Sequence, residues 1–303
     1  MRILLGTHYL AKTGGTECYT YALAMELKRL GHDVEYFANV LGHTSNRVEE
    51  LGVPFMTGGT YDLILANHTT VVPAVYKMGY TIQTCHGAIA ELEQPSPYAD
   101  AHVAVSLEVA DNLRSKGYEP VAIIHNGIDC DRFYPKHPVN DNLRTVLSLC
   151  QGERGHNFVK RCCERAGYEF IRADKYTDNV WDIERLINQA DLVVGLGRSV
   201  YDAMSCGRCA LIYDFRDYVG HTLADGLVTL ETIRRSMRYN CNGKAINRHF
   251  DDDSFIAEMQ KYSPTIAKWG RSYATRFLNI KHVVKKYLNI INNGRPEDNT
   301  SAH

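Results

Sequence analysis

Two short segments of the chain place glycines where a phosphate could approach the main chain. Gly14 and Gly15 follow the apolar run 2–6 and precede a helical pattern over 16–30. The first N–H groups of a helix are unpaired and lie at the positive end of its dipole, so they bind anions. Glycine leaves room for such a ligand. Taken in isolation, a flexible turn with a helix cap is the simpler explanation, since the full G-x-G-x-x-G pattern is absent.

The second segment is G-L-G-R-S, residues 195–199, which follows an apolar run and opens a predicted helix over 199–205. Gly195 and Gly197 again precede a helix N-terminus, and Arg198 adds a fixed positive charge beside it. The segment therefore has the composition of a second phosphate site.

Other polar residues lie just after predicted strands. His86 follows one such strand and His8 ends another. A histidine at the carboxyl end of a strand can contact a ligand or transfer a proton. The alternative is that it has only a structural role. Arg154 follows Gly152 after a third strand, and Lys160 lies in the next helix. For these two cations, a solvated basic face is the alternative to a phosphate contact.

The elements that must position these residues alternate along the chain. In the first half, apolar runs and helical patterns predict strands at 2–6, 33–37, 62–66, 81–84, 101–105 and 121–124, and helices at 16–30, 44–51, 70–78 and 107–116. In the second half they predict strands at 144–149, 168–171, 191–195 and 209–213, and helices at 156–166, 181–189, 199–205, 229–239 and 252–261. Such alternation indicates an α/β fold with parallel sheets covered by helices.

A Pro- and Asn-rich stretch, residues 134–142, separates the two halves and is predicted to be a linker. We therefore expect an N-terminal Rossmann-like domain over 1–137 and a C-terminal one over 142–262. The helical pattern over about 265–292 is expected to pack across both halves and to complete the N-terminal domain. Parallel sheets bind ligands at the carboxyl ends of their strands, so a site between the halves is expected.

The composition narrows the class of protein. The chain has 303 residues, 45% hydrophobic and 23% charged, as in globular proteins. A net charge of −1 makes the protein as a whole a poor electrostatic match for nucleic acid. No apolar stretch reaches the length of a membrane span, and the apolar run after Met1 and Arg2 is too short for a signal peptide. With nine cysteines expected as reduced thiols, a cytoplasmic protein is predicted.

Four motifs together resemble the family 4 glycosyltransferases. They are G-G-T-E at 14–17, G-H-D-V at 31–34, H-N-G-I-D-C-D-R-F-Y-P at 125–135, and the segment 190–207 with its D-A-M-S-C-G. The third is the most specific, because the N-terminal domain of that family closes with Asn-Gly-Ile-Asp, then Arg-Phe and Pro. The resemblance implies the GT-B fold, with two Rossmann-like domains facing each other across a cleft. It also implies transfer of a sugar from a nucleotide-sugar donor, UDP- or GDP-linked, with retention at the anomeric carbon.

The resemblance also implies roles for individual residues. In the family, a glutamate before Ala-Met binds the ribose hydroxyls of the nucleotide. Asp202 stands at that position here, and a carboxylate can accept from two vicinal hydroxyls. The expected catalytic residues are His86, Arg154 and Arg198. The expected donor-binding residues are Gly14, Gly15, Asn126, Arg154, Lys160, Gly197, Arg198, Ser199 and Asp202.

The expected chemistry uses neither a metal nor a cofactor besides the nucleotide-sugar. Main-chain N–H groups and arginines can stabilise the leaving diphosphate without a metal ion. Where the family has a second glutamate, eight positions before the first, this chain has Val194. A nucleotide-sugar-binding protein without catalysis is therefore one alternative, and a nucleotide-sugar epimerase of the same fold is another.

The segment 261–286 carries seven Lys and Arg residues and no Asp or Glu. A solvated face of a structural helix is the simplest explanation. Peripheral contact with the anionic inner face of a membrane would suit a lipid-linked acceptor. Contact with DNA would suit a phage-type enzyme that glycosylates DNA bases. The acceptor therefore stays open among a glycan, a lipid-linked molecule and a modified nucleic acid.

Overall fold

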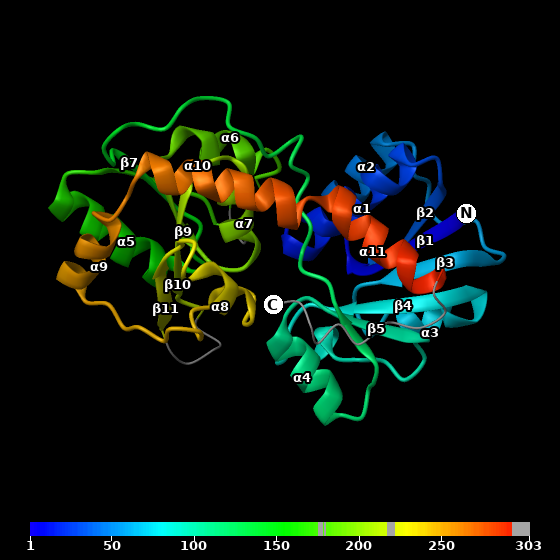
Figure 1. Cartoon of the computed structure of the whole chain (residues 1–303). Helices are drawn as coiled ribbons and strands as arrows, with labels where there is room; N and C mark the ends of the chain where they lie inside the picture. The colour runs from blue at the N-terminus through cyan, green and yellow to red at the C-terminus, as the bar shows by residue number, and fades with distance from the viewer. Residues whose placement is uncertain (175–177, 179, 217–221, 293–303) are drawn as a thin grey trace. The chain divides into compact units, whose positions relative to one another are not determined.

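A computed structural model describes residues 1–174, 178, 180–216 and 222–292 (Figure 1). The chain divides into two compact units. Unit 1 contains Met1–Gly127 with Ile280–His303, and unit 2 contains Ile128–Asn279. Each unit is built around its own sheet.

Unit 1 has a six-stranded parallel sheet in the order β2-β1-β3-β4-β5-β6. Its strands are β1 (Arg2–Tyr9), β2 (Asp33–Val40), β3 (Tyr61–Ala66), β4 (Gly79–Cys85), β5 (Ala101–Ala104) and β6 (Val121–Ile123). Its helices are α1 (Gly15–Arg29), α2 (His43–Glu50), α3 (Val72–Val75), α4 (Leu107–Ser115) and α11 (Ile280–Asn292), with 3₁₀ turns at Tyr76–Met78 and Glu91–Glu93. The predicted helix 70–78 is therefore a short α-helix followed by a 3₁₀ turn.

The sheet of unit 1 is covered on both faces, because successive side chains of a strand point to opposite sides. Ile3 and Leu5 of β1 join a core with α1, α2 and α11, whereas Leu4 packs with α3. A third cluster places α4 on β5 and β6. Figure 1 shows α1 and α11 on one side of this sheet and α4 on the other. Burial on both faces explains why these strands are continuous apolar runs in the sequence.

Unit 2 has a five-stranded sheet in the order β11-β10-β9-β7-β8. Its strands are β7 (Thr145–Ser148), β8 (Glu169–Arg172), β9 (Leu192–Gly195), β10 (Cys209–Asp214) and β11 (Leu223–Leu227). Four strands are parallel, but β11 runs antiparallel to β10 at the edge. The sequence analysis predicted parallel sheets but did not predict the antiparallel edge strand β11.

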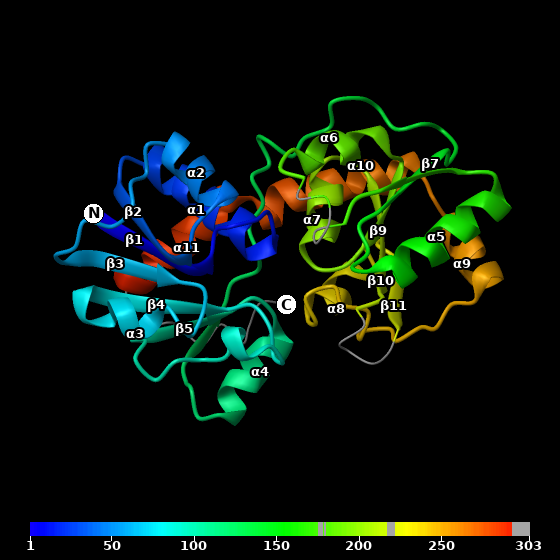
Figure 2. The ribbon, with the colours of Figure 1, turned by 180° about the vertical axis from the view of Figure 1, so that it is seen from behind.

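The helices of unit 2 are α5 (Glu153–Ala166), α6 (Ile183–Gln189), α7 (Arg198–Ser205), α8 (Ile233–Met237), α9 (Asp252–Met259) and α10 (Pro264–Tyr273). Helices α5 and α9 cover one face of the sheet, with Val146 and Leu192 beneath them (Figure 2). Helices α6, α7 and α8 cover the other, above Leu147 and Val193. The predicted helix 229–239 is helical only over α8.

The C-terminal helical stretch belongs to both units in turn. Helix α10 continues into a π-helical turn, Ala274–Leu278, that packs in unit 2, and α11 then packs against α1 in unit 1. In this division the chain leaves unit 1 after Gly127 and returns to it at Ile280, whereas the sequence analysis expected a boundary at 137 and packing of the segment over about 265–292 across both halves. The physical reason is that Ala274 and Leu278 bury their side chains beside α7 and α8, whereas Val284 and Tyr287 bury theirs in unit 1.

The nine cysteines are free thiols, and eight of them are buried. Cys206 and Cys209 have the C-x-x-C spacing, although the sequence analysis had found no such pair. They join different cores, Cys206 beside α7 and Cys209 beside α9 and α10, so their spacing reflects packing on two faces of the sheet. Among the described residues, no helix is long and apolar enough to cross a membrane.

Candidate functional site

In unit 2, the glycine-marked start of α7 lies at the carboxyl end of β9. Gly197 caps the helix with φ of +56°, a conformation that favours glycine. Its N–H donates to the Cys241 carbonyl, and the carbonyl oxygen of Asn240 lies 3.7 Å from where a Cβ of Gly197 would stand. The side-chain Oδ1 of Asn240 is buried without a hydrogen-bond partner among the described residues. The loop and the helix start therefore fit closely together around main-chain groups.

Asp202 lies one turn into α7 and is only 7% exposed. Its Oδ2 lies 3.5 Å from Nε of Arg198, and its Oδ1 has no hydrogen-bond partner in the described part of the chain. Burial raises the pKa of Asp202 to about 6, an effect that the positive charges of Arg198 and Arg132 only partly offset. A buried carboxylate oxygen without a donor costs free energy that a ligand hydroxyl could recover.

A second ion pair accompanies this one. Arg132 donates from Nη2 to Oε2 of Glu184 at 3.0 Å, and its guanidinium packs over the ring of Trp181. Arg198 packs over the ring of Phe133, which follows Arg132 in the chain. The arginine expected to face a phosphate is thus held against an acid and an aromatic ring, in a cluster that the sequence analysis did not predict.

The other expected residues of this edge are placed differently. Ser199, in the first turn of α7, donates its N–H to the Leu196 carbonyl, 3.2 Å away. Val194, at the position of the second family glutamate, is fully buried in the core and is not placed to contact a ligand. Arg154 is exposed in the first turn of α5, with its guanidinium 5.9 Å from the ring of Phe215. Lys160 forms an exposed pair with Glu164 at 3.8 Å, as a solvated helix face would.

An acidic side chain from outside α5 already binds near the N-terminus of this helix. Asp174, which follows β8, accepts the N–H of Gly152 and the Nε2–H of His156, at 3.2 and 3.3 Å. The other ring nitrogen of His156 lies 2.9 Å from Oγ of Ser148. Ser148 is fully buried in β7, so this Ser–His–Asp chain is structural and holds the turn before α5.

In unit 1, Gly14 and Gly15 lie at the start of α1, as predicted. A Cβ on Gly14 would meet the carboxylate of Glu17, whereas one on Gly15 would meet nothing within 4 Å. None of the residues that the structure describes therefore requires Gly15 to lack a side chain. The open space beside Gly15 is compatible with a ligand, and the Glu17 carboxylate gives the Gly14 side of the helix start a negative charge.

His86 lies after β4 and bonds through Nε2 to Oδ1 of Asn67, 3.0 Å away. Asn67, which follows β3, in turn donates to Oγ1 of Thr20 on α1. The ring of His86 also meets the ring of Tyr19 edge-on. His86 is thus held in one orientation at the carboxyl edge of the sheet by groups from β3 and α1.

His8 lies at the same edge, at the end of β1. Its Nδ1 is 2.6 Å from Oγ1 of Thr70 and 3.0 Å from Nδ2 of Asn39. His68, which follows β3, accepts the main-chain N–H of His8 through its own Nδ1. The sequence analysis missed Asn39, His68 and Thr70; the signal that it passed over is the polar run N-H-T-T directly after a buried strand.

The H-N-G-I-D motif lies where the chain leaves unit 1. Gly127 packs closely against α11, because a Cβ there would stand 2.7 Å from Cδ1 and 3.1 Å from Cα of Ile280. Asp129 turns the chain by accepting the N–H groups of Asp131 and Arg132. Asn126 is 7% exposed, and its side chain makes no hydrogen bond within the described residues, so it stays a candidate for contact with a ligand.

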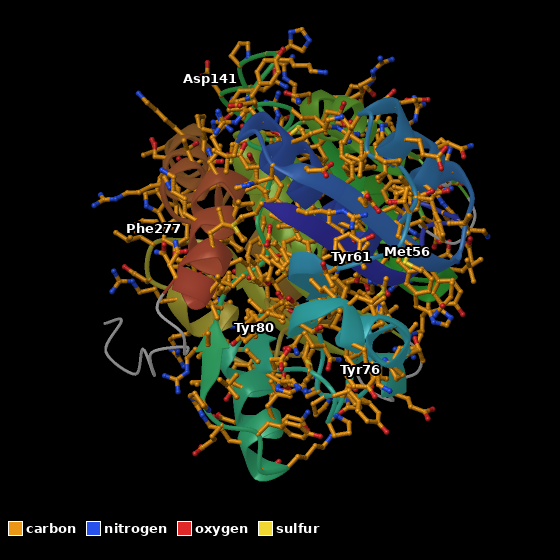
Figure 3. The ribbon with its side chains drawn as sticks, turned by 90° about the vertical axis from the view of Figure 1, so that its right-hand side faces the viewer. Met56, Tyr61, Tyr76, Tyr80, Asp141 and Phe277 are labelled. Carbon is orange, nitrogen blue, oxygen red and sulfur yellow. The ribbon has the colours of Figure 1, made fainter. Side chains whose placement is uncertain are left out.

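The basic segment 261–286 is not one charged face. Arg271 points inward, where its guanidinium donates to the carbonyls of Cys130, Phe133 and Ser205. Lys268 is exposed, and so is Phe277, which projects from the π-helical turn (Figure 3). Part of the positive charge that the sequence analysis assigned to a surface is therefore structural.

No family model matches the sequence, and no curated protein matches it. Solved structures do. The Anabaena protein Alr3699/HepE, in complex with UDP and glucose, is similar over 97% of this chain and 100% of its own, with 15% identity and a TM-score of 0.66. The chain has the GT-B fold. Each of its two sheets, mostly parallel and covered by helices, is of the kind that this fold combines.

Proteins with other chemistries are also similar in structure. A Listeria monocytogenes protein proposed to be a UDP-N-acetylglucosamine 2-epimerase covers 98% of this chain and 99% of its own, at 14% identity and a TM-score of 0.58. An α-glucosyltransferase in complex with UDP and a 13-mer DNA covers 96% and 100%, at 12% identity and a TM-score of 0.52. Because one fold hosts these different activities, the function must be argued from the site.

Proposed function

We propose that the protein is a glycosyltransferase that moves a sugar from a UDP- or GDP-linked donor to an acceptor hydroxyl, with retention and without a metal ion. Asp202 is the main support for the proposal, because it stands at the ribose-binding position of the motif and has a carboxylate oxygen without a hydrogen-bond donor. Its Oδ1 is buried without a donor, at the carboxyl edge of unit 2 where this class of sheet binds ligands. Two vicinal ribose hydroxyls would supply the missing hydrogen bonds.

Arg198 supplies the positive charge of the proposed donor site. In the free protein its guanidinium neutralises part of the Asp202 charge. When ribose hydroxyls bind Asp202, the guanidinium of Arg198 is the nearby charged group that can stabilise the charge growing on the leaving diphosphate. A separate phosphate-binding position is proposed in unit 1 at Gly15, because a Cβ there would meet nothing within 4 Å among the described residues.

The experiment is thermal unfolding of the full chain with UDP, GDP, ADP, CMP and TDP and their common sugars. A ligand at about 100 times its Kd stabilises the folded state by about 2.7 kcal/mol. We expect the nucleotides of one base to raise the melting temperature of the wild type. The same nucleotides should not change the melting temperature of Asp202→Asn. Glu231→Gln, which changes an exposed acid of the same unit, is the matched control and should behave as wild type.

The sugar products then separate the candidate reactions. A transferase releases free nucleotide faster when an acceptor is present. An epimerase would change the sugar while it stays nucleotide-linked, and a binding protein would release no nucleotide. The buried Val194 favours this last candidate over an epimerase, because the chain lacks the acid that the family uses for the donor sugar. If no nucleotide shifts the unfolding curve, the donor site is refuted.

A further inference from the structure

The His8 ring is held with one nitrogen committed. Nδ2 of Asn39, from β2, lies 3.0 Å from Nδ1 of His8, and Oγ1 of Thr70 lies 2.6 Å from the same atom. An amide nitrogen only donates, so Nδ1 of His8 accepts, and the ring proton of neutral His8 is on Nε2. Nε2 of His8 makes no hydrogen bond with any described residue. The edge thus presents an oriented N–H donor.

A second histidine, His68, helps to fix the position of His8. Its Nδ1 accepts the main-chain N–H of His8 at 3.0 Å and lies 3.1 Å from Oγ1 of Thr7. Burial, and to a lesser degree the neighbouring His8, lower the pKa of His68 to about 4, so the ring is neutral near pH 7. Its proton is therefore also on Nε2. Three segments, the ends of β1 and β2 and the turn after β3, fix the two imidazoles in their orientations.

The surroundings of His8 indicate the kind of ligand. Among the described residues, the side chains that form hydrogen bonds or ring contacts with His8 and His68 include those of Thr7, Tyr9, Asn39 and Thr70, and these four are uncharged. A phosphate or sulfate is normally met by Arg or Lys, whereas neutral donors suit hydroxyl oxygens. The Tyr9 ring meets that of His8 edge-on and is 43% exposed, and Val40, its register partner on β2, is 37% exposed.

An exposed apolar surface beside oriented neutral donors matches a sugar ring, which has hydroxyls at its rim and C–H groups on its faces. We propose that the His8 edge, defined as His8, Tyr9, Asn39, His68 and Thr70, binds an uncharged sugar as the acceptor. His8 donates Nε2–H to a hydroxyl oxygen of that sugar. It positions the acceptor and does not remove a proton from it, because Nε2 already carries one. That this sugar is the acceptor of the reaction rests on the proposed transferase function, whereas the sugar-binding site itself does not.

The test is binding of neutral sugars to the full chain without any donor. The probes are the methyl glycosides of glucose, galactose, mannose and N-acetylglucosamine, and the readout is the ¹⁵N spectrum of the histidine rings. The His8 signals are assigned by their loss in His8→Gln. We expect the pattern of an Nε2–H imidazole for His8, and a shift of its Nε2 signal with at least one glycoside.

Asn39→Asp changes the tautomer without removing the ring. A carboxylate only accepts, so in the neutral ring the His8 proton moves to Nδ1 and Nε2 loses its donor role. Binding is therefore measured at a basic pH, where the imidazole beside the new carboxylate is neutral. Affinity for the glycoside should fall about fivefold or more, the loss of one hydrogen bond. Asn46→Asp, which places the same charge change at an exposed position of α2, is the matched control and should bind as wild type.

The proposal is overturned if His8 shows the Nδ1–H tautomer, or if no glycoside moves its signal. It is also overturned if inorganic phosphate or duplex DNA moves the signal as much as the glycosides do. Melting with UDP and GDP is measured on the same samples. If no nucleotide binds while a glycoside still moves the His8 signal, the transferase function fails and the sugar site stands.

Discussion

The free energy of unfolding of unit 2 is expected to fall between pH 4 and pH 7 because of one buried carboxyl group. The pKa of Asp202 is raised from 3.8 to about 6 by burial. Between those values the folded protein binds more protons than the unfolded chain, so stability decreases as the pH rises. At about 1.4 kcal/mol for each pKa unit, the loss is about 3 kcal/mol, and it is complete above the folded-state pKa.

Asp202→Asn removes this titration while keeping the shape of the side chain. Relative to wild type, the variant should gain about 3 kcal/mol when the pH is raised from 4 to 7. For a unit of this size, that corresponds to a difference of about 6–12 °C in melting temperature. The two tryptophans of the chain, Trp181 and Trp269, both lie in unit 2, so tryptophan fluorescence follows the unfolding of this unit alone.

Glu231→Gln is the control, because it removes an exposed acid from the same unit. Its stability relative to wild type should not change between pH 4 and pH 7. The reasoning would be refuted by a constant difference between Asp202→Asn and wild type over that range. Such a result would mean that the ionised Asp202 is already satisfied in the free protein, and the case for a missing ligand hydroxyl would be lost.

If ribose binds ionised Asp202, UDP or GDP affinity should fall about tenfold for each pH unit below 6 in wild type, and calorimetric titration of Asp202→Asn should show no such dependence. Gly127→Ala would place a Cβ 2.7 Å from a side-chain atom of α11 and should destabilise unit 1 by about 1–3 kcal/mol. Gly15→Ala meets no protein atom within 4 Å, so it should leave the circular-dichroism melting curve unchanged yet weaken nucleotide binding; unchanged binding would remove Gly15 from the donor site. Arg271→Met should destabilise unit 2 by about 2–4 kcal/mol, because it leaves three carbonyls without a donor. The control Lys268→Met should change stability by less than about 0.5 kcal/mol. Equal effects of the two substitutions in urea unfolding would mean that Arg271 is a surface residue.

Most of the fold was predictable, because strands buried on both faces and helices with one apolar face leave clear patterns. L-V-V-G of β9 and the L-I-Y run of β10 are examples of such strands. Strand β11 left no such pattern, since its sequence L-A-D-G-L has an acid and a glycine at its centre. It forms as an edge strand because β10 offers unpaired main-chain groups, which is a property of the assembled sheet.

The C-terminal helices also have a feature that the sequence pattern does not predict. Their periodicity predicts helix over about 265–292, but not the change of packing partner at Asn279 and Ile280. Likewise, no local pattern encodes the close packing of Gly127 against α11, which lies about 150 residues away in the chain.

For the candidate site, the sequence by itself determined which residues to consider: the glycine-marked helix starts, Asp202 in its motif, and His86 and His8 after strands. The tertiary structure alone decided their surroundings. It buried Asp202 against Arg198 and left one oxygen without a donor, and it placed Lys160 in an ordinary surface pair. It also joined His8 to partners about 30 and 60 residues away. Motifs record residue type and spacing, but burial and hydrogen-bond partners arise only when parallel strands bring distant segments to one edge.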